Sequence, residues 1–176
     1  DNDPLHLSAA GFHWYCIDDK VTKWVQPMRQ EVLARGEPFL LNVCYVGFDS
    51  SLAFQQVDPL EYAEYALATL NHLKQKFSLV PDIWELRLEP DRRFQVTGAQ
   101  LGKNLATLGP RVRSAGYPAL YFAVPSMADP NRTTSFLSSI KAVPGTASFI
   151  KEVTYHRYSL PQASTRNRRS PPWLPS

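Results

Sequence analysis

The sequence lacks several features that mark specialised classes of protein. Its only two cysteines, Cys16 and Cys44, are too few for a disulfide framework and lack CxxC spacing. Charged residues interrupt every hydrophobic run, so no stretch approaches the ~20 consecutive apolar residues of a membrane-spanning helix. These absences exclude a disulfide-rich scaffold and a membrane span.

Motifs that bind phosphates and metals are missing too. The sequence contains neither GxGxxG nor a P-loop, and the GxSxG motif of serine hydrolases is absent. The four histidines, His6, His13, His72 and His156, form no pair at the helical spacing of a metal site. We therefore expect no nucleotide, no other cofactor and no metal.

Acidic residues are absent from residues 157–176, which hold four arginines. The whole chain has 19 Lys and Arg against 16 Asp and Glu, so the remainder of the chain is close to neutral. A neutral body offers no basic face to a phosphate backbone, and we expect no nucleic-acid partner. Residues 161–176 are rich in Pro and Arg without apolar periodicity, which predicts an irregular tail.

What is present is the composition of an ordinary globular domain. Hydrophobic residues make up 44% of the 176 positions and charged residues 20%. A chain of this length buries roughly 70% of the surface that its unfolded form exposes, so we expect one substantial core.

Helical and strand-like patterns alternate along the chain. Apolar residues at the helical period predict helices over residues 18–35, 58–77, 100–115 and 133–142. Short β-rich runs predict strands over residues 39–46, 83–89, 119–124 and 153–158. This spacing is typical of βα units and predicts an α/β fold with a parallel sheet. Two architectures fit: an open doubly wound sheet, or part of a (β/α)8 barrel.

Two of these helices have more specific signals. Asp58-Pro59-Leu60-Glu61 combines an N-cap residue, a proline at the first helical position and an acid at the third. In the helix over residues 18–35, one apolar stripe is predicted to face the core; its members are Val21, Trp24, Val25, Met28 and Val32.

The segment PDIWELRLEPD, residues 81–91, brings ionisable side chains into a strand. By the period of two, Glu85, Arg87 and Glu89 share one face of that strand. On an exposed edge strand this would be an ordinary solvated face. In the middle of a βα series both faces are covered, and a charge there needs a partner. We expect Arg87 to pair with Glu85, and the charged face to line a functional interior such as a barrel mouth.

The order of motifs resembles the middle of a clan A glycoside hydrolase. The resemblance rests on PDIWELRLEP, on a GxQxG sequence at Gly98–Gly102 that opens a helix, and on a strand ending in His156-Arg157-Tyr158. It covers residues 1–160 and implies a retaining (β/α)8 TIM barrel, of which the chain would supply roughly the third to sixth strands.

The resemblance implies roles for individual residues. Glu89 would be the general acid/base, and His156 and Tyr158 would border the site. Two further candidates come from the residues themselves. As the alternative to pairing with Glu85, Arg87 would contact the carbohydrate substrate, and Tyr45 could stack on a sugar face rather than pack in the core.

Two departures from the family pattern leave an alternative open. Leu88 precedes the glutamate where the family has an asparagine, and no acidic residue follows Glu152 to serve as the nucleophile. A retaining mechanism needs two carboxyl groups ~5 to 5.5 Å apart. We therefore expect that the chain is a fragment, or that its reading frame fails near Ser159, and that alone it is inactive. The alternative is a non-catalytic carbohydrate-binding relative of the same fold.

Overall fold

The computed structural model describes residues 12–46, 58–92 and 96–156. Its centre is a four-stranded sheet in the order β1-β2-β3-β4, and all three neighbouring pairs are parallel. The strands are β1 (Asn42–Cys44), β2 (Ile83–Glu85), β3 (Tyr121–Met127) and β4 (Ile150–Tyr155). The predicted α/β class with a parallel sheet is confirmed.

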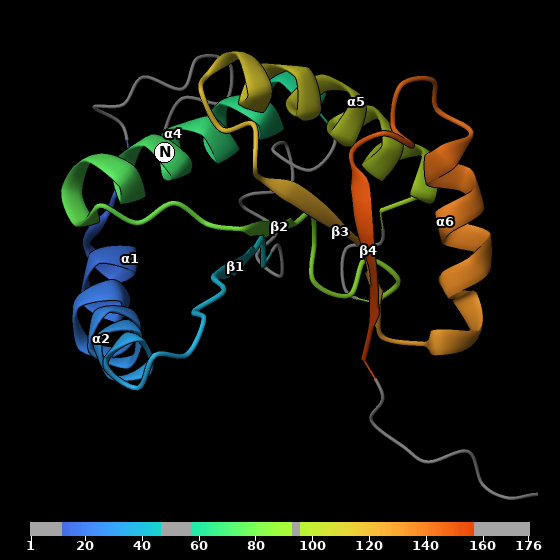
Figure 1. Ribbon diagram of the computed structural model, residues 1–176. Coiled ribbons are helices and arrows are strands. Elements are labelled where there is room, and N and C mark those ends of the chain that lie inside the picture. Colours follow the sequence, from blue (N-terminus) through green and yellow to red (C-terminus); the bar gives the residue numbers. More distant parts are fainter. Residues whose placement is uncertain (1–11, 47–57, 93–95, 157–176) are drawn as a thin grey trace, which may run out of the picture.

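Among the described residues, one helix follows each of the first three strands. These helices are α4 (Pro59–Phe77), α5 (Gly98–Ser114) and α6 (Thr133–Lys141), the last preceded by the 3-10 turn η4 (Pro130–Arg132). Figure 1 shows them as an arc along one side of the strands. In the part of the chain that is described, no helix combines the length and apolarity needed to cross a membrane.

Side-chain caps explain where α4 and α5 begin. The Asp58 carboxylate accepts a hydrogen bond from the Leu60 backbone N–H at 2.8 Å, which confirms the predicted N-cap. The Thr97 hydroxyl accepts from the Gln100 backbone N–H at 3.1 Å and caps α5. Each cap satisfies a backbone donor that would otherwise have no partner in the first helical turn.

The main core lies between the sheet and these helices. Trp84 of β2 and Phe122 of β3 are register partners, each only 1% exposed, and both belong to this apolar cluster. Trp84 Nε1 donates to the Tyr62 hydroxyl on α4 at 2.9 Å, and that hydroxyl donates to the Leu86 carbonyl at 2.5 Å. The buried indole N–H of Trp84 and the buried hydroxyl of Tyr62 are thus both hydrogen-bonded, as the low local dielectric favours.

The N-terminal helical segment comprises α1 (Tyr15–Lys20), the π-helical turn η2 (Val21–Val25) and α2 (Gln26–Ala34). It packs on the end of α4 through a small cluster built around Val21, Leu73 and Leu79. The predicted apolar stripe is wrong in part, because Trp24 is 68% and Met28 58% exposed. A π-helical turn breaks the 3.6-residue period, so residues that were predicted to share one face of the helix lie on different faces.

Strand boundaries also differ from the prediction. β2 ends at Glu85 rather than residue 89, and β4 begins at Ile150, three positions before the expected start. The strand cannot extend to residue 89 as predicted, because Glu89 adopts a left-handed φ of 48° that no extended strand contains.

Candidate active site

The side chains of interest gather where the parallel strands end. Tyr45 directly follows β1, Glu85 closes β2, Ser126 precedes the last residue of β3, and His156 directly follows β4. In parallel α/β folds this carboxyl edge of the sheet is where ligands bind.

Glu89 lies in the loop after β2 and is 5% exposed. Its backbone N–H donates to the Ser126 carbonyl at 2.9 Å, which ties the loop to the end of β3. A left-handed conformation at a non-glycine residue costs of order 1–3 kcal/mol and is found where surrounding structure enforces it, often at functional sites. The backbone that carries the Glu89 carboxylate is thus held in one conformation.

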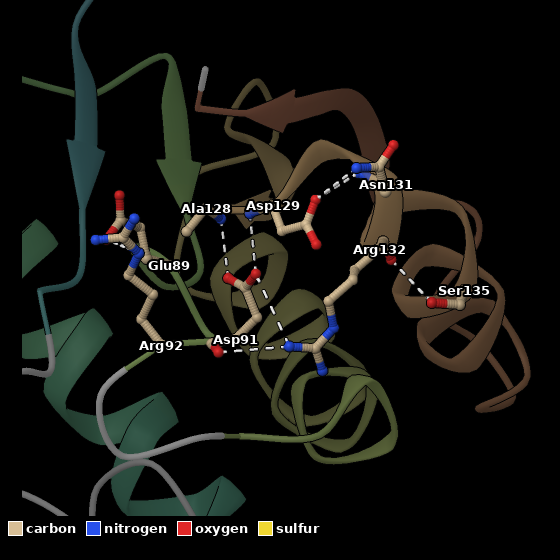
Figure 2. Close-up of polar contacts among 8 residues, drawn as sticks. All are labelled: Glu89, Asp91, Arg92, Ala128, Asp129, Asn131, Arg132 and Ser135. Atoms are coloured by element: carbon tan, nitrogen blue, oxygen red, sulfur yellow. Dashed lines mark hydrogen bonds and ion pairs between the residues drawn. The ribbon is translucent and has the colours of Figure 1, made fainter. Parts of the chain in front are cut away.

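Both carboxylate oxygens of Glu89 have basic neighbours. His156 Nδ1 lies 2.9 Å from Oε1, and Arg92 Nε lies 3.7 Å from Oε2. Figure 2 shows Arg92 beside Glu89. The His156 side chain is 31% exposed, so the pair reaches from a buried carboxylate to the surface. The structure therefore brings together Glu89 and His156, which are 67 positions apart.

A second buried carboxylate, that of Glu85, lies at the same edge. Its Oε2 accepts from Asn42 Nδ2 at 2.9 Å, and its Oε1 accepts from the Ser126 hydroxyl. Burial, followed by the nearby Glu85 charge and hydrogen bond, raises the pKa of the Cys44 thiol far above its ordinary value. Cys44 is consequently a neutral thiol at physiological pH.

Arg87 does not pair with Glu85 as predicted. Within the described residues it forms no ion pair with Glu85, and instead it borders a small internal pocket with Tyr45 and Tyr62. Burial lowers the pKa of the Arg87 guanidinium, and the two tyrosines partly offset this effect. The expected pairing is wrong because β2 ends at Glu85, so the alternation of faces does not continue to Arg87.

Tyr45 also packs toward the helices. It is 4% exposed, and its ring meets the rings of Tyr62 and Tyr65 edge to face at centroid distances of 5.5 and 5.3 Å. These contacts make Tyr45 a core residue with little surface left for a sugar. The fifth predicted site residue, Tyr158, lies outside the described residues.

Asp91 organises the loop that carries Glu89. Its carboxylate accepts from the backbone N–H groups of Ala128 and Asp129 at 2.8 and 3.0 Å, as Figure 2 shows. Arg132 Nη1 lies 4.0 Å from the same carboxylate. The loop after β2 is therefore joined to the segment after β3 here and to the end of β3 itself at Ser126.

The sequence prediction missed Asn42 and Ser126. Asn42 did have a signal, because it is a polar residue within the apolar run over residues 39–46. A polar side chain in such a run needs a partner, and here that partner is Glu85. Ser126 had no comparable signal, because its role depends on its backbone conformation.

No group of three or more His, Cys, Asp or Glu side chains is arranged to share a metal ion within residues 12–46, 58–92 and 96–156.

Comparison with known proteins adds no relative: no protein-family model matches the chain, and no curated protein is significantly similar to it.

Proposed function

We propose that this chain is part of a retaining glycoside hydrolase of the (β/α)8-barrel type, with Glu89 as its general acid/base and a carbohydrate as its substrate. The observation that carries the proposal is the placement of Glu89. A buried carboxylate stands at the carboxyl edge of a parallel sheet, in an enforced left-handed conformation, against a partly exposed histidine.

The chemistry of a retaining glycosidase suits one such carboxyl group. In the first step Glu89 would give its proton to the glycosidic oxygen while a second carboxylate attacks the anomeric carbon and the C–O bond breaks. In the second step Glu89 would take a proton from water as that water releases the sugar. We assign no residue of this chain to the nucleophile.

The barrel is part of the proposal. Three consecutive βα units with neighbouring parallel strands, and helices packed in a single cluster on one side, are compatible with an arc of a barrel wall. On this proposal the described strands correspond to the third to sixth of eight.

The experiment compares leaving groups. We expect the 176 residues alone to release no phenol from aryl glycosides, and a longer chain carrying the flanking coding sequence to do so. In that longer chain, Glu89→Ala should slow substrates with poor leaving groups by about 10²- to 10⁴-fold, the usual contribution of a general acid. The dinitrophenolate leaving group departs without protonation, so Glu89→Ala should leave the first step of dinitrophenyl glycosides nearly unaffected.

Azide provides the second arm of the test. It attacks the glycosyl intermediate without needing a base, so it should restore turnover to Glu89→Ala and produce a glycosyl azide with retained configuration. Glu31→Ala is the matched control, because Glu31 is an exposed glutamate whose ion pair among the described residues is with Arg35, four positions along the chain. An equal loss for all leaving groups, without azide rescue, would overturn the role of Glu89.

The non-catalytic alternative is supported by Leu88, which stands where the family has the asparagine that contacts the sugar. For that function, glycans should bind to the longer chain, as measured by calorimetry, and no hydrolysis should occur. If the longer chain neither bound nor hydrolysed glycans, both functions would be contradicted.

A further inference from the structure

Glu89 depends on Ser126 for its position. The Glu89 backbone has a φ of 48°, and its N–H donates to the Ser126 carbonyl at 2.9 Å. A non-glycine residue stays in this region only where neighbouring structure determines it. The Ser126 carbonyl therefore restrains the Glu89 backbone, from which the carboxylate extends toward His156.

Ser126 itself has an uncommon backbone. It is fully buried, with no exposed surface, and its φ is 57°. Serine has no special tolerance for the left-handed region, so it too needs an external restraint. Its hydroxyl supplies one, because it donates to Glu85 Oε1.

Glu85 is anchored on its other side by β1. Its Oε2 accepts from Asn42 Nδ2 at 2.9 Å, while its own backbone belongs to β2 and Ser126 belongs to β3. The carboxylate is 7% exposed and thus joins three neighbouring strands in a site largely closed to water. A buried charge-assisted hydrogen bond is stronger and more directional than an exposed one.

We propose that Ser126 and Glu85 are positioning residues for Glu89. Asn42 fixes Glu85, Glu85 fixes Ser126, and the Ser126 carbonyl holds the Glu89 backbone so that its carboxylate meets His156. Neither Ser126 nor Glu85 needs to touch the substrate. The inference rests on the proposed function, since positioning matters for turnover only if Glu89 acts in catalysis.

The kinetic test uses four variants of the longer chain and one control variant. Ser126→Ala and Glu85→Ala each remove one end of the hydrogen bond and should lower kcat about 10- to 100-fold, the cost of a small misplacement of a reacting group. KM should change less than about 3-fold, because no substrate contact is lost. The double variant should be no slower than the slower single variant, because both remove the same interaction.

Glu85→Gln is the conservative variant. Its amide oxygen can still accept from Ser126, and the exposed Asn42 can rotate to offer its own oxygen to the new amide, so kcat should stay within about 3-fold of the original. The matched control is Thr146→Val. Thr146 is also fully buried and donates to backbone carbonyls at 2.9 and 3.0 Å, remote from the carboxyl edge. It should lower stability and leave kcat unchanged.

Crystal structures of the original 176-residue chain and its Ser126→Ala variant provide a readout independent of activity. The variant should separate Glu89 Oε1 from His156 Nδ1, which are 2.9 Å apart, beyond the 3.5 Å limit of a hydrogen bond. An unchanged separation would overturn the positioning role, as would additive losses in the double variant. If the original longer chain proves inactive and binds no glycan, the proposed function fails, and the crystal structures alone decide whether Ser126 positions Glu89.

Discussion

The βα body and the N-terminal helical segment are held in very different ways. The body, from β1 to β4, has one apolar cluster that draws buried side chains from α4, α5, α6 and the sheet. The N-terminal helical segment contributes a single buried residue, Val21, among its described residues. Its other contacts with α4 include the interactions of Asp18 with His72 and Lys76.

The difference shows which part of the molecule determines the candidate site. Glu89, Ser126 and His156 are connected by hydrogen bonds across three strands, and these strands are fixed by the apolar cluster behind them. The N-terminal helical segment contacts the far end of α4 through Leu73 and Leu79. Substitutions in the body should therefore have large effects, and those in the segment small ones.

The largest effect is expected at Gly102, where α5 approaches α6. A Cβ added there would lie 2.6 Å from Val143 Cγ2 and 2.9 Å from the Ile140 carbonyl oxygen. The carbonyl belongs to the backbone and cannot rotate away, so Gly102→Val should lower the free energy of unfolding by about 3 kcal/mol.

Urea denaturation measures this loss. The control Lys103→Val separates the steric effect of the new side chain from the effect of valine on helix propensity. Lys103 is the next residue of α5 and is exposed, so a valine there costs only its propensity difference, below about 1 kcal/mol. Equal losses in the two variants would contradict close packing between α5 and α6.

The next largest effect is expected at Asp91. Its two carboxylate oxygens accept from the backbone N–H groups of Ala128 and Asp129. Asn can accept with one oxygen only and turns an N–H toward the other donor, so Asp91→Asn should cost about 1–3 kcal/mol. The control is Asp19→Asn, because Asp19 forms an exposed ion pair with Lys23. Thermal denaturation compares the loss of stability in the two variants. Equal stability of the two variants would show that the loop does not depend on Asp91.

The order of elements in the βα body was predictable because local signals and burial agree there. The cap at Asp58 and the apolar period behind it predict α4, and the structure has it at Pro59–Phe77. The apolar stripe over residues 18–35 was misleading, because the segment contains a π-helical turn that the stripe did not indicate. Periodicity assumes one helical geometry, and it fails where that geometry changes.

The candidate site was predictable only in part. Glu89 and His156 stand at strand ends in the sequence, and parallel pairing brings such ends to one edge. The position of Arg87 was not predictable, because it required knowing that β2 ends at Glu85. Ser126 was likewise hidden, since its contribution is a backbone carbonyl whose direction only the folded structure reveals.

A smaller, pH-dependent effect is expected where the N-terminal helical segment meets α4. Asp18 lies 2.6 Å from His72 Nε2 and 2.7 Å from Lys76 Nζ. Burial raises the pKa of the Asp18 carboxyl, but the hydrogen bonds and charges of Lys76 and His72 together lower it below its ordinary value.

A lowered pKa in the folded state means that the ionised carboxylate stabilises the fold. This contribution is complete above the unfolded pKa of about 4 and is lost as the pH falls through the folded pKa. Asp18→Asn should therefore lower stability at pH 7 by less than about 1 kcal/mol, and the difference should shrink below about pH 4. Thermal denaturation of both proteins at pH 7 and pH 3 tests this, and a pH-independent difference would contradict it.

The smallest effect is expected at Trp24, in the middle of the N-terminal helical segment. A regular helix over residues 18–35 would place Trp24 beside Val21 on the buried face, and replacing it would then cost several kcal/mol, about 3–5 for a buried tryptophan. In the structure the π-helical turn leaves Trp24 68% exposed while Val21 is 4% exposed. Trp24→Ser should therefore change the free energy of unfolding by no more than about 0.5 kcal/mol, and Val21→Ala should cost more than Trp24→Ser although it removes fewer atoms. Urea denaturation of the two variants decides between the geometries, since the reverse order would mean that the segment is a regular helix with Trp24 in the core.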